Sequence, residues 1–582
     1  MEAAVAANRI QAIILDLTNF TEKKTLVGGG SAGAVLANRL SEDITATVLL
    51  IEAGGIENEV SDIPLIAATM QMSPLDWSYR TEPQKTSCFG LEGRRSPWPR
   101  GKALGGSSVI NYMIYIRGNP HDYDHWAENG CEGWSWKEVF PYFLKSEDNR
   151  DPAILQNGFA IPQGTIRRSA RCSTGKAFIK PIRHRKNLHI TLYSHATKIH
   201  FDEWNNARAV QFERFKVPHM VFARREIILS AGSIGSTQIL LLSGIGPKHD
   251  LQKMGLRPVA QLCIYMMISV KEGEVAYAYD DVLLSNNASL LGYNLQDHIY
   301  PGGMNFLVRD PVSMVQTRVF NLKQILRYLT IGKGPLTLLG GVEGLAFINT
   351  KYANKSMDWP DIEIHYLSGS PVSDGGQTFR RTEGISDELW EKVYAPYVYA
   401  DTMSVYPVLL RPKSRGFVKL RSRNPYDPPL LDPKYLSHPD DIMTLVDAMK
   451  FSMAVAETPA FQRYGVRMWD LPFPGCDHYK HLSDENLACM ARSFTNTIYH
   501  PVGTAKMGPV WDPTTVVDPK LRVKGVQRLR VIDASIMPTI VSGNTNAPSI
   551  MIGEKGADIV KAAWAHHSNF HQQLHEAAKR KR

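Results

Sequence analysis

The stretch Leu26-Val27-Gly28-Gly29-Gly30-Ser31-Ala32-Gly33 decides the fold of this chain. An apolar run follows and ends at Glu52, at the spacing of roughly 20 residues that dinucleotide-binding units have. Gly28 allows a tight turn, Gly30 leaves room for a pyrophosphate, and Gly33 lets a helix pack on the preceding strand. Free N–H groups at the helix N-terminus attract phosphates. The pattern therefore predicts a strand, glycine turn, helix and strand that bind a dinucleotide, with Glu52 accepting from a ribose hydroxyl.

The composition is that of a globular protein, with 43% hydrophobic and 21% charged residues among 582. This length exceeds one hydrophobic core and predicts two domains or one elaborated α/β domain. The formal net charge of +9 lies partly in Lys579–Arg582, and no basic stripe with interleaved aromatic residues accompanies it. Nucleic acid is therefore not an expected partner.

No apolar stretch reaches the roughly 20 residues that a transmembrane helix needs. Glu2 and Asp16 flank the short apolar run Ile13–Leu15, so we expect no signal peptide at this N-terminus. Location in or outside the cell and oligomeric state stay open.

Six cysteines are too few and too scattered for a disulfide framework, and none of their spacings predicts a metal site. Cys476 and Cys489 are close enough in sequence for a local bridge, although two free thiols are about equally compatible with the spacing.

Two strand-like runs that lie far apart in the sequence are typical of strands in one parallel sheet. Glu226–Ser230 and Leu529–Asp533 are short apolar runs that end in a polar residue, as strands do whose carboxyl ends face a ligand. Between them, proline-punctuated stretches such as Ser404–Leu410 and Gly416–Leu420 predict antiparallel strands of a second domain. Trp134, Trp136, Tyr142 and Phe143 are expected to pack in a core, and Glu343 to be an ordinary strand acid.

Four segments follow one another along the chain: Pro99–Asn111, Ser230–Pro247, Tyr499–Thr504 and Gly543–Pro548. Their combination and order are highly specific for one protein family. They closely resemble the signature and C-terminal segments of the glucose-methanol-choline (GMC) family of flavin oxidoreductases. The connecting segments are most similar to the insect glucose dehydrogenase (FAD, quinone) branch of that family.

The resemblance implies an α/β protein with a Rossmann-like FAD-binding domain on a parallel sheet, and a substrate domain built on an antiparallel sheet packed with helices. The expected boundaries are 20–300 for the FAD-binding region, 301–495 for the substrate domain, 496–562 for a return to the FAD domain with the catalytic residues, and 563–582 for a basic tail.

The resemblance also assigns residues to parts of FAD. Gly28, Gly30, Ser31 and Gly33 would hold the pyrophosphate, Glu52 the adenosine ribose, Ser107 and Asn111 the flavin end, Ala196 the adenine through its backbone, and Asp533 the phosphates and ribityl chain. Some relatives attach FAD covalently through a histidine at a position that Ile110 fills here, so the flavin is expected to be non-covalent and dissociable.

The chemistry expected from the resemblance is oxidation of an alcohol, with sugars among the candidates, by hydride transfer to flavin N5. A neutral imidazole suits removal of the hydroxyl proton near pH 7, and His500 is the expected base. Asn544 is expected to hold the substrate oxygen, with Asn546 as the alternative register. Electrons would pass to a quinone or another acceptor. An oxidase that uses O₂, or a catalytically inactive scaffold, is the alternative.

Three segments depart from the family pattern. Lys23-Lys24-Thr25 leaves only Leu26 and Val27 as an apolar first strand, so we expect a weakened sheet centre. Several dozen residues that relatives carry after Pro152 are missing, and Cys263–Leu291 has no family counterpart and predicts a disordered loop. We hypothesise splicing or gene-assembly irregularities here, which transcript sequencing of the three junctions would test. Cys88 is expected to lack a disulfide partner, because Ser96 and Ala505 stand where relatives often have cysteine.

Overall fold

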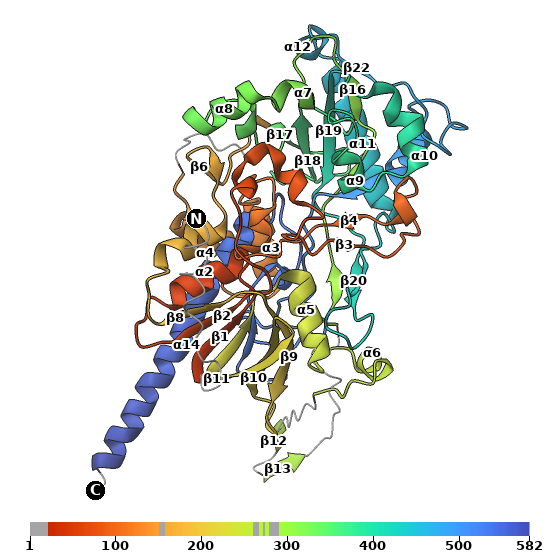
Figure 1. Cartoon of the computed structure of the whole chain (residues 1–582). Coiled ribbons are helices and arrows are strands. Elements are labelled where there is room, and N and C mark those ends of the chain that lie inside the picture. Colours follow the sequence, from red (N-terminus) through yellow and green to blue (C-terminus); the bar gives the residue numbers. More distant parts are fainter. Residues whose placement is uncertain (1–20, 150–157, 260–266, 272–273, 279–289, 581–582) are drawn as a thin grey trace.

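The computed structural model describes residues 21–149, 158–259, 267–271, 274–278 and 290–580 (Figure 1). The predicted glycine unit lies at the centre of a seven-stranded sheet with the order β8-β2-β1-β11-β10-β9, in which β24 also pairs with β11. Strands β8, β2, β1, β11 and β24 are parallel, and β10 and β9 continue the sheet in antiparallel fashion. Their bounds are β1 Thr21–Val27, β2 Val48–Ile51, β8 Leu188–Thr191, β9 Ser194–Phe201, β10 Ala207–Arg214, β11 Val217–Leu229 and β24 Leu529–Val531. The two distant runs predicted to be parallel strands are therefore neighbours, as β11 and β24.

The first strand extends beyond the apolar pair Leu26 and Val27, since β1 has seven residues and includes the charged run. Lys24 is 2% exposed and pairs in register with Glu226 on β11. Burial lowers the pKa of Lys24 to about 8, against the opposing effect of Glu226. The Glu226 carboxylate also accepts from Arg530 Nε at 2.7 Å and from Trp564 Nε1 at 2.7 Å. The negative charge of Glu226 on the neighbouring strand thus lets Lys24 occupy β1.

Two helices from opposite ends of the chain pack together over this sheet (Figure 1). The glycine turn leads into α2 (Ser31–Leu40), which packs against α14 (Asn546–Arg580). Arg39 joins them by donating from Nε and Nη2 to the buried Glu554 carboxylate at 2.8 and 2.7 Å. Helix α14 continues through most of the predicted basic tail, 563–582.

The predicted aromatic core lies under α3 (Pro120–Glu128) and α4 (Trp136–Ser146), each of which begins with a capping box. Trp134 and Phe143 are fully buried, and Trp136 and Tyr142 pack against the same core while partly exposed. The packing role predicted for these four residues is confirmed.

A second, eight-stranded antiparallel sheet has the order β22-β16-β19-β18-β17-β5, with β15 paired to β19 and β23. Its strands are β5 Gly158–Ala160, β15 Ile299–Pro301, β16 Asn305–Leu307, β17 Val342–Ile348, β18 Ile362–Leu367, β19 Thr402–Leu409, β22 Arg467–Met468 and β23 Thr495–Thr497. Helices α11 (Pro439–Ala456) and α13 (Asp484–Ser493) contribute to its core. The α/β fold with an additional antiparallel domain is confirmed.

Of the two antiparallel strands predicted between 404 and 420, the first is β19. The second is β20 (Gly416–Lys419), which pairs instead with β14 (Tyr293–Leu295) and β21 (Leu430–Asp432) in a separate three-stranded sheet. Glu343 is an exposed residue of β17, as expected of a strand acid.

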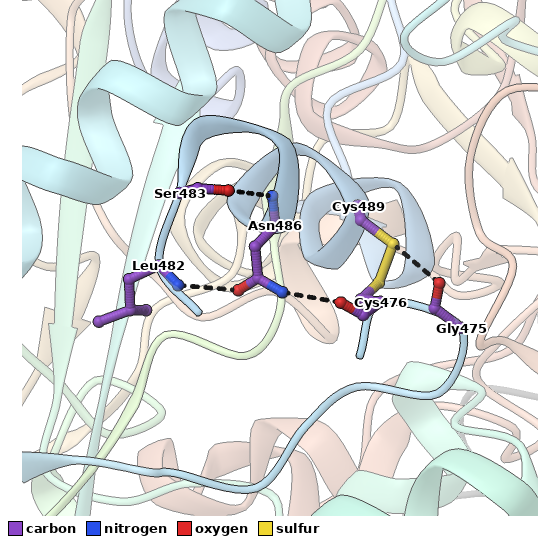
Figure 2. Close-up of a disulfide and its surroundings, with 6 residues drawn as sticks. All are labelled: Gly475, Cys476, Leu482, Ser483, Asn486 and Cys489. Atoms are coloured by element: carbon purple, nitrogen blue, oxygen red, sulfur yellow. Dashed lines mark hydrogen bonds between the residues drawn. A yellow bond between two sulfur atoms is a disulfide. The ribbon is translucent and has the colours of Figure 1, made fainter. Parts of the chain in front are cut away.

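The structure decides between the two alternatives for Cys476 and Cys489: they form a disulfide (Figure 2). Asn486 closes the same loop, since its Oδ1 accepts from Leu482 N at 3.1 Å and its Nδ2 donates to Cys476 O at 3.0 Å. Cys88 is buried and free, as predicted, and its Sγ donates to Thr495 O at 3.2 Å.

The prediction of a loop without secondary structure over 263–291 is wrong for its described part. Strands β12 (Met267–Lys271) and β13 (Glu274–Ala278) form an antiparallel hairpin. The rest of that segment up to 289, and the junction at 150–157, lie outside the described residues. Along the described chain, no helix combines the length and apolarity needed to span a bilayer.

Candidate active site

One cleft brings together all but one of the residues predicted for cofactor binding and catalysis, at the carboxyl ends of the parallel strands. They are Gly28, Gly30, Ser31, Glu52, Ser107, Asn111, Ala196, His500, Asp533 and Asn544. Gly33 does not line the cleft. It lies one helical turn behind it, where an added Cβ would stand 1.9 Å from Gly28 O. Its role is therefore the close helix–strand packing that the glycine pattern predicts.

The glycine turn forms a narrow cradle. Gly28 has φ +98°, and a Cβ there would lie 2.6 Å from Ser230 O, so no other residue fits without strain. The turn also packs closely against the segment of Gly106, where a Cβ would lie 2.6 Å from Gly30 Cα. Helix α2 begins at Ser31 without a side-chain cap, so its N-terminal N–H groups are available to an anionic group. These features fit a pyrophosphate.

Glu52 directly follows β2 and is held by backbone donors. Its Oε2 accepts from Gly29 N at 2.7 Å and its Oε1 from Gly54 N at 2.8 Å. Burial raises the pKa of Glu52, and these hydrogen bonds oppose that rise. Each carboxylate oxygen keeps a second lone pair, so the group can still accept from a ribose hydroxyl.

Asp533 follows β24 and ties the strand ends together. Its Oδ2 accepts from Gly232 N at 2.9 Å and Ser236 Oγ at 2.6 Å, at the start of α5 (Gly232–Leu242). Its Oδ1 accepts from the backbone and hydroxyl of Ser535 at 2.8 and 2.6 Å. Four donors thus already engage this carboxylate, so its contribution to the cleft is mainly the placement of these backbone segments.

The segment predicted at the flavin end is fixed by a buried arginine that sequence reasoning missed. Arg171 donates from Nη1 to Asn111 O at 2.6 Å and to Asn111 Oδ1 at 2.8 Å, and from Nε to Ser61 O at 2.7 Å. Ser107 Oγ accepts from Gly101 N at 3.1 Å. The Asn111 side chain therefore fixes the conformation of this segment through its hydrogen bond with Arg171. Arg171 stands in a stretch without any motif that would have marked it.

At the opposite end of the cleft, Ala196 on β9 lies among aromatic residues. The neighbouring His195 ring stacks on Tyr426 with centroids 4.8 Å apart and meets Trp77 edge-on at 5.6 Å. Gln238 of α5 also lines this end. A flat, partly apolar site of this kind suits an adenine ring.

A chain of hydrogen bonds fixes the proton positions on His500. His298 Nε2 donates to Leu410 O at 3.0 Å, so Nδ1 of a neutral His298 must accept. The group facing it is His500 Nδ1 at 2.9 Å, which therefore carries the proton. His500 Nε2 is left with a lone pair, 3.2 Å from Asn544 Nδ2.

Both imidazoles are neutral in these surroundings. Burial lowers the pKa of His298 to about 3 and lowers the pKa of His500 well below its ordinary value. The neighbouring His298 and Arg100 lower the pKa of His500 further. Sequence reasoning missed the role of His298. No motif in the run Asn294–His298 marks this contact. Asp297, next to His298 in the chain, also contacts the base, since its Oδ1 accepts from His500 N at 2.8 Å.

The two asparagines considered for the catalytic position have different partners. Asn544 Nδ2 faces His500, and Asn544 Oδ1 is buried without a hydrogen-bond partner. Asn546 Oδ1 accepts from Ser31 Oγ at 2.7 Å, so Asn546 belongs to the glycine turn. An unsatisfied amide oxygen beside a basic nitrogen is the arrangement expected where a ligand binds.

Comparison with known proteins agrees with the motifs. Sequence models of the GMC oxidoreductase family match residues 23–167, 147–300 and 412–553. The chain is 35% identical to glucose dehydrogenase [FAD, quinone] of Drosophila melanogaster, over 93% of this chain and 86% of that protein. It is 33% identical to alcohol dehydrogenase [acceptor] of Pseudomonas putida, over 92% and 95%.

Among solved structures, pyridoxine 4-oxidase from Mesorbium loti matches with a TM-score of 0.72 and 26% identity, over 92% of this chain and 99% of that one. The glycine cradle, the cleft and the matched sequences agree with one another. The chain belongs to the GMC oxidoreductase family and is an FAD-dependent oxidoreductase.

Proposed function

We propose that this protein oxidises an alcohol to the carbonyl compound with His500 as the base, and passes the electrons to a quinone or a similar acceptor. The observation that carries the proposal is the pair His500 Nε2 and Asn544 Nδ2, 3.2 Å apart in the cleft that the glycine turn also lines. A base and an amide donor can there hold one hydroxyl oxygen between them.

His500 takes the hydroxyl proton on Nε2, the nitrogen that the His298 contact leaves unprotonated. Asn544 Nδ2 then turns from His500 to the substrate oxygen and stabilises the negative charge that develops there. Electron density on that oxygen weakens the adjacent C–H bond, and FAD supplies the hydride acceptor when bound. The imidazolium that forms keeps its Nδ1–H donated to His298, which holds the ring in place.

The residues that would hold FAD are those of the cleft: Gly28, Gly30 and Ser31 at the pyrophosphate, Glu52 at the ribose, Ala196 at the adenine, and Ser107 and Asn111 at the flavin end. Asp533 would act near the phosphates and ribityl chain through the backbone segments that it places. Ile110, which also lines the cleft, has no nucleophilic atom, so attachment is non-covalent. Denaturation with acid should therefore release the yellow colour into the supernatant. Colour retained in the protein pellet would contradict this.

A quinone is supported by the name of the Drosophila relative, an acceptor of unstated kind by that of the Pseudomonas relative, and an oxidase by that of the Mesorbium structure. A quinone and O₂ are distinguished as acceptors with one alcohol under air. Reduction of a quinone dye without peroxide supports the proposal, and stoichiometric peroxide supports the oxidase.

The central test is anaerobic. Purified protein reconstituted with FAD is mixed with an alcohol, and loss of the oxidised-flavin absorbance is followed by stopped flow. We expect bleaching that the His500→Ala variant loses. Protein that binds no flavin at all would favour the inactive scaffold.

A further inference from the structure

Helix α8 (Leu322–Ile331) lies at an outer edge of the molecule (Figure 1) and has no buried residue. Both of its ends are capped, since Asn321 Oδ1 accepts from Gln324 N at 3.2 Å and Gly332 closes the helix with φ +61°. Within the described chain, α8 packs mainly on the single turn η8 (Pro335–Thr337). A helix of ten residues owes most of its stability in water to the packing of an apolar face. The sequence thus encodes a helix whose apolar face this fold leaves uncovered.

That face is a stripe of leucines, Leu322, Leu326 and Leu329, which we call the leucine stripe. Their positions i, i+4 and i+7 place them on one side of the helix, and they are 72%, 51% and 70% exposed. Phe320 just before the helix and Ile331 at its end are also exposed. Single exposed apolar residues are ordinary, whereas a row of them along one helix marks a contact surface.

Cations border the leucine stripe. Lys323 and Arg327 each follow a leucine of the stripe, so they lie along its flank, and Lys333 comes just after the helix. All three side chains are exposed. The sequence has no Asp or Glu from residue 311 to residue 342, so this segment is purely cationic.

A neighbouring turn adds to the positive surface. Gly332 lies against the turn between β6 (Ile166–Arg167) and β7 (Ala170–Arg171), because a Cβ on Gly332 would stand 2.8 Å from Ser169 Oγ. Arg168, next to Ser169 in that turn, is exposed. The cations beside α8 therefore come from two segments that are far apart in the sequence.

One acid, Asp62, lies near the helix. Burial and the charge of Asp62 together raise the pKa of Tyr328. Asp62 is already paired with Lys176, so it adds little negative charge to the surface around the leucine stripe.

We propose that α8 docks this protein on the surface of a lipid bilayer with anionic headgroups. The leucine stripe enters the boundary between headgroups and acyl chains, while Lys323, Arg327, Lys333 and Arg168 lie at the lipid phosphates. A fluid bilayer adapts to a projecting helix, whereas a protein partner would need a preformed groove for it. The inference goes beyond the proposed oxidation and does not depend on it.

The test is co-sedimentation of the full-length, flavin-loaded protein with vesicles of phosphatidylcholine, with and without about 30% phosphatidylserine. We expect binding to the phosphatidylserine vesicles that weakens in high salt. The double variant Lys323→Glu/Arg327→Glu should lower the partition coefficient at least about 10-fold, because each cation at an anionic surface contributes roughly fivefold. The triple variant L322Q/L326Q/L329Q keeps good helix formers and should also lower it about 10-fold or more.

The matched control is Lys248→Glu/Lys253→Glu on α6 (Lys248–Lys253), which Figure 1 places far from α8. It changes the net charge by the same amount at two exposed positions and should bind vesicles like the wild type. The thermal midpoint and flavin absorbance should stay unchanged in all three variants, because every altered side chain is exposed.

No binding to either kind of vesicle overturns the proposal. Equal losses in the α6 and α8 charge variants also overturn it, since they would mean attraction by the net charge of the whole protein. Undiminished binding in both α8 variants would assign the contact to other residues, such as the basic tail Lys579–Arg582. A dimer in lipid-free sedimentation velocity that L322Q/L326Q/L329Q dissociates, together with no vesicle binding, would assign the leucine stripe to a second copy of this chain.

Discussion

At the scale of single residues, the basicity of His500 depends on one carbonyl oxygen two contacts away. Leu410 O fixes the tautomer of His298, and His298 fixes that of His500. The sequence predicted His500 and Asn544 because both stand in recognisable motifs. It could not predict the histidine pair or Arg171, because their roles arise from contacts between positions far apart in the chain.

Replacing His500 by alanine removes the proton acceptor while the cradle for the cofactor remains. We expect the rate of flavin reduction to fall about 10²- to 10⁴-fold at unchanged flavin content. Anaerobic stopped flow against the wild-type protein measures it, and His200→Ala, on β9 but not among the residues that line the cleft, serves as the control. A rate within threefold of wild type would contradict the assignment.

The depressed pKa values of His298 and His500 predict how stability depends on pH. An unfolded histidine takes up a proton below about pH 6.5, whereas these two stay neutral in the native state, His298 down to about pH 3. Their contribution is therefore complete above pH 6.5 and is lost as the pH falls toward 3. Urea unfolding at pH 7 and pH 5 should show this loss, and His298→Asn should reduce it. Equal pH slopes in both proteins would argue against it.

At the scale of elements, the turn between β1 and α2 needs glycine for reasons of space. In Gly33→Ala the new Cβ would overlap Gly28 O, so the turn must shift. We expect a loss of about 1–3 kcal/mol in the free energy of unfolding, together with reduced flavin content.

The matched change is Gly344→Ala on β17, where a Cβ would meet only ordinary contacts at 3.5 Å. It should leave the thermal midpoint and flavin absorbance close to those of wild type. Full flavin occupancy in Gly33→Ala would show that the turn tolerates the shift.

Strand β1 shows where reasoning from local pattern failed. A run with two lysines looks too polar for a sheet centre, but the carboxylate that balances Lys24, Glu226, lies on β11, where it also pairs with Arg530 of β24, and cannot be seen from the run itself. The hairpin β12–β13 was missed for a related reason, because its pairing depends on two short runs without a recognisable turn sequence.

Lys24 lowers stability at neutral pH, since its pKa of about 8 in the folded protein lies below the 10.5 of an exposed lysine. The unfolded chain therefore gains a proton first as the pH falls from 10.5 to 8, and stability drops across that range. Lys24→Met should raise the free energy of unfolding at pH 7 by about 1–3 kcal/mol and remove the dependence between pH 8 and 10.5. Chemical denaturation at pH 7, 9 and 10 tests both effects, and a destabilised variant would mean that Lys24 chiefly balances Glu226.

At the scale of the whole molecule, the parallel sheet is assembled from both ends of the chain. Family motifs predicted this return, but not that β5, which precedes most of the FAD-domain strands, would pair with β17 in the other sheet. Partners of edge strands are set by the final arrangement of the domains rather than by local sequence.

A chain that ends at Gln527 lacks β24, Asn544 and α14, and we expect it to bind no flavin. A chain that ends at Ala565 keeps β24, Asn544, the first part of α14 and the Trp564–Glu226 hydrogen bond. The last turns of α14 project away from both sheets (Figure 1), so the longer chain should keep flavin and activity. Absorbance spectra of the two purified proteins distinguish them, and flavin binding by the shorter chain would contradict the expectation.

The late position of β24 and α14 also bears on biosynthesis. Assembly of the redox centre must wait until synthesis has reached Asn544 and the helix that contacts α2 through Arg39 and Glu554. Until β24 has been made, the part of β11 beside it lacks its last neighbouring strand in the parallel sheet.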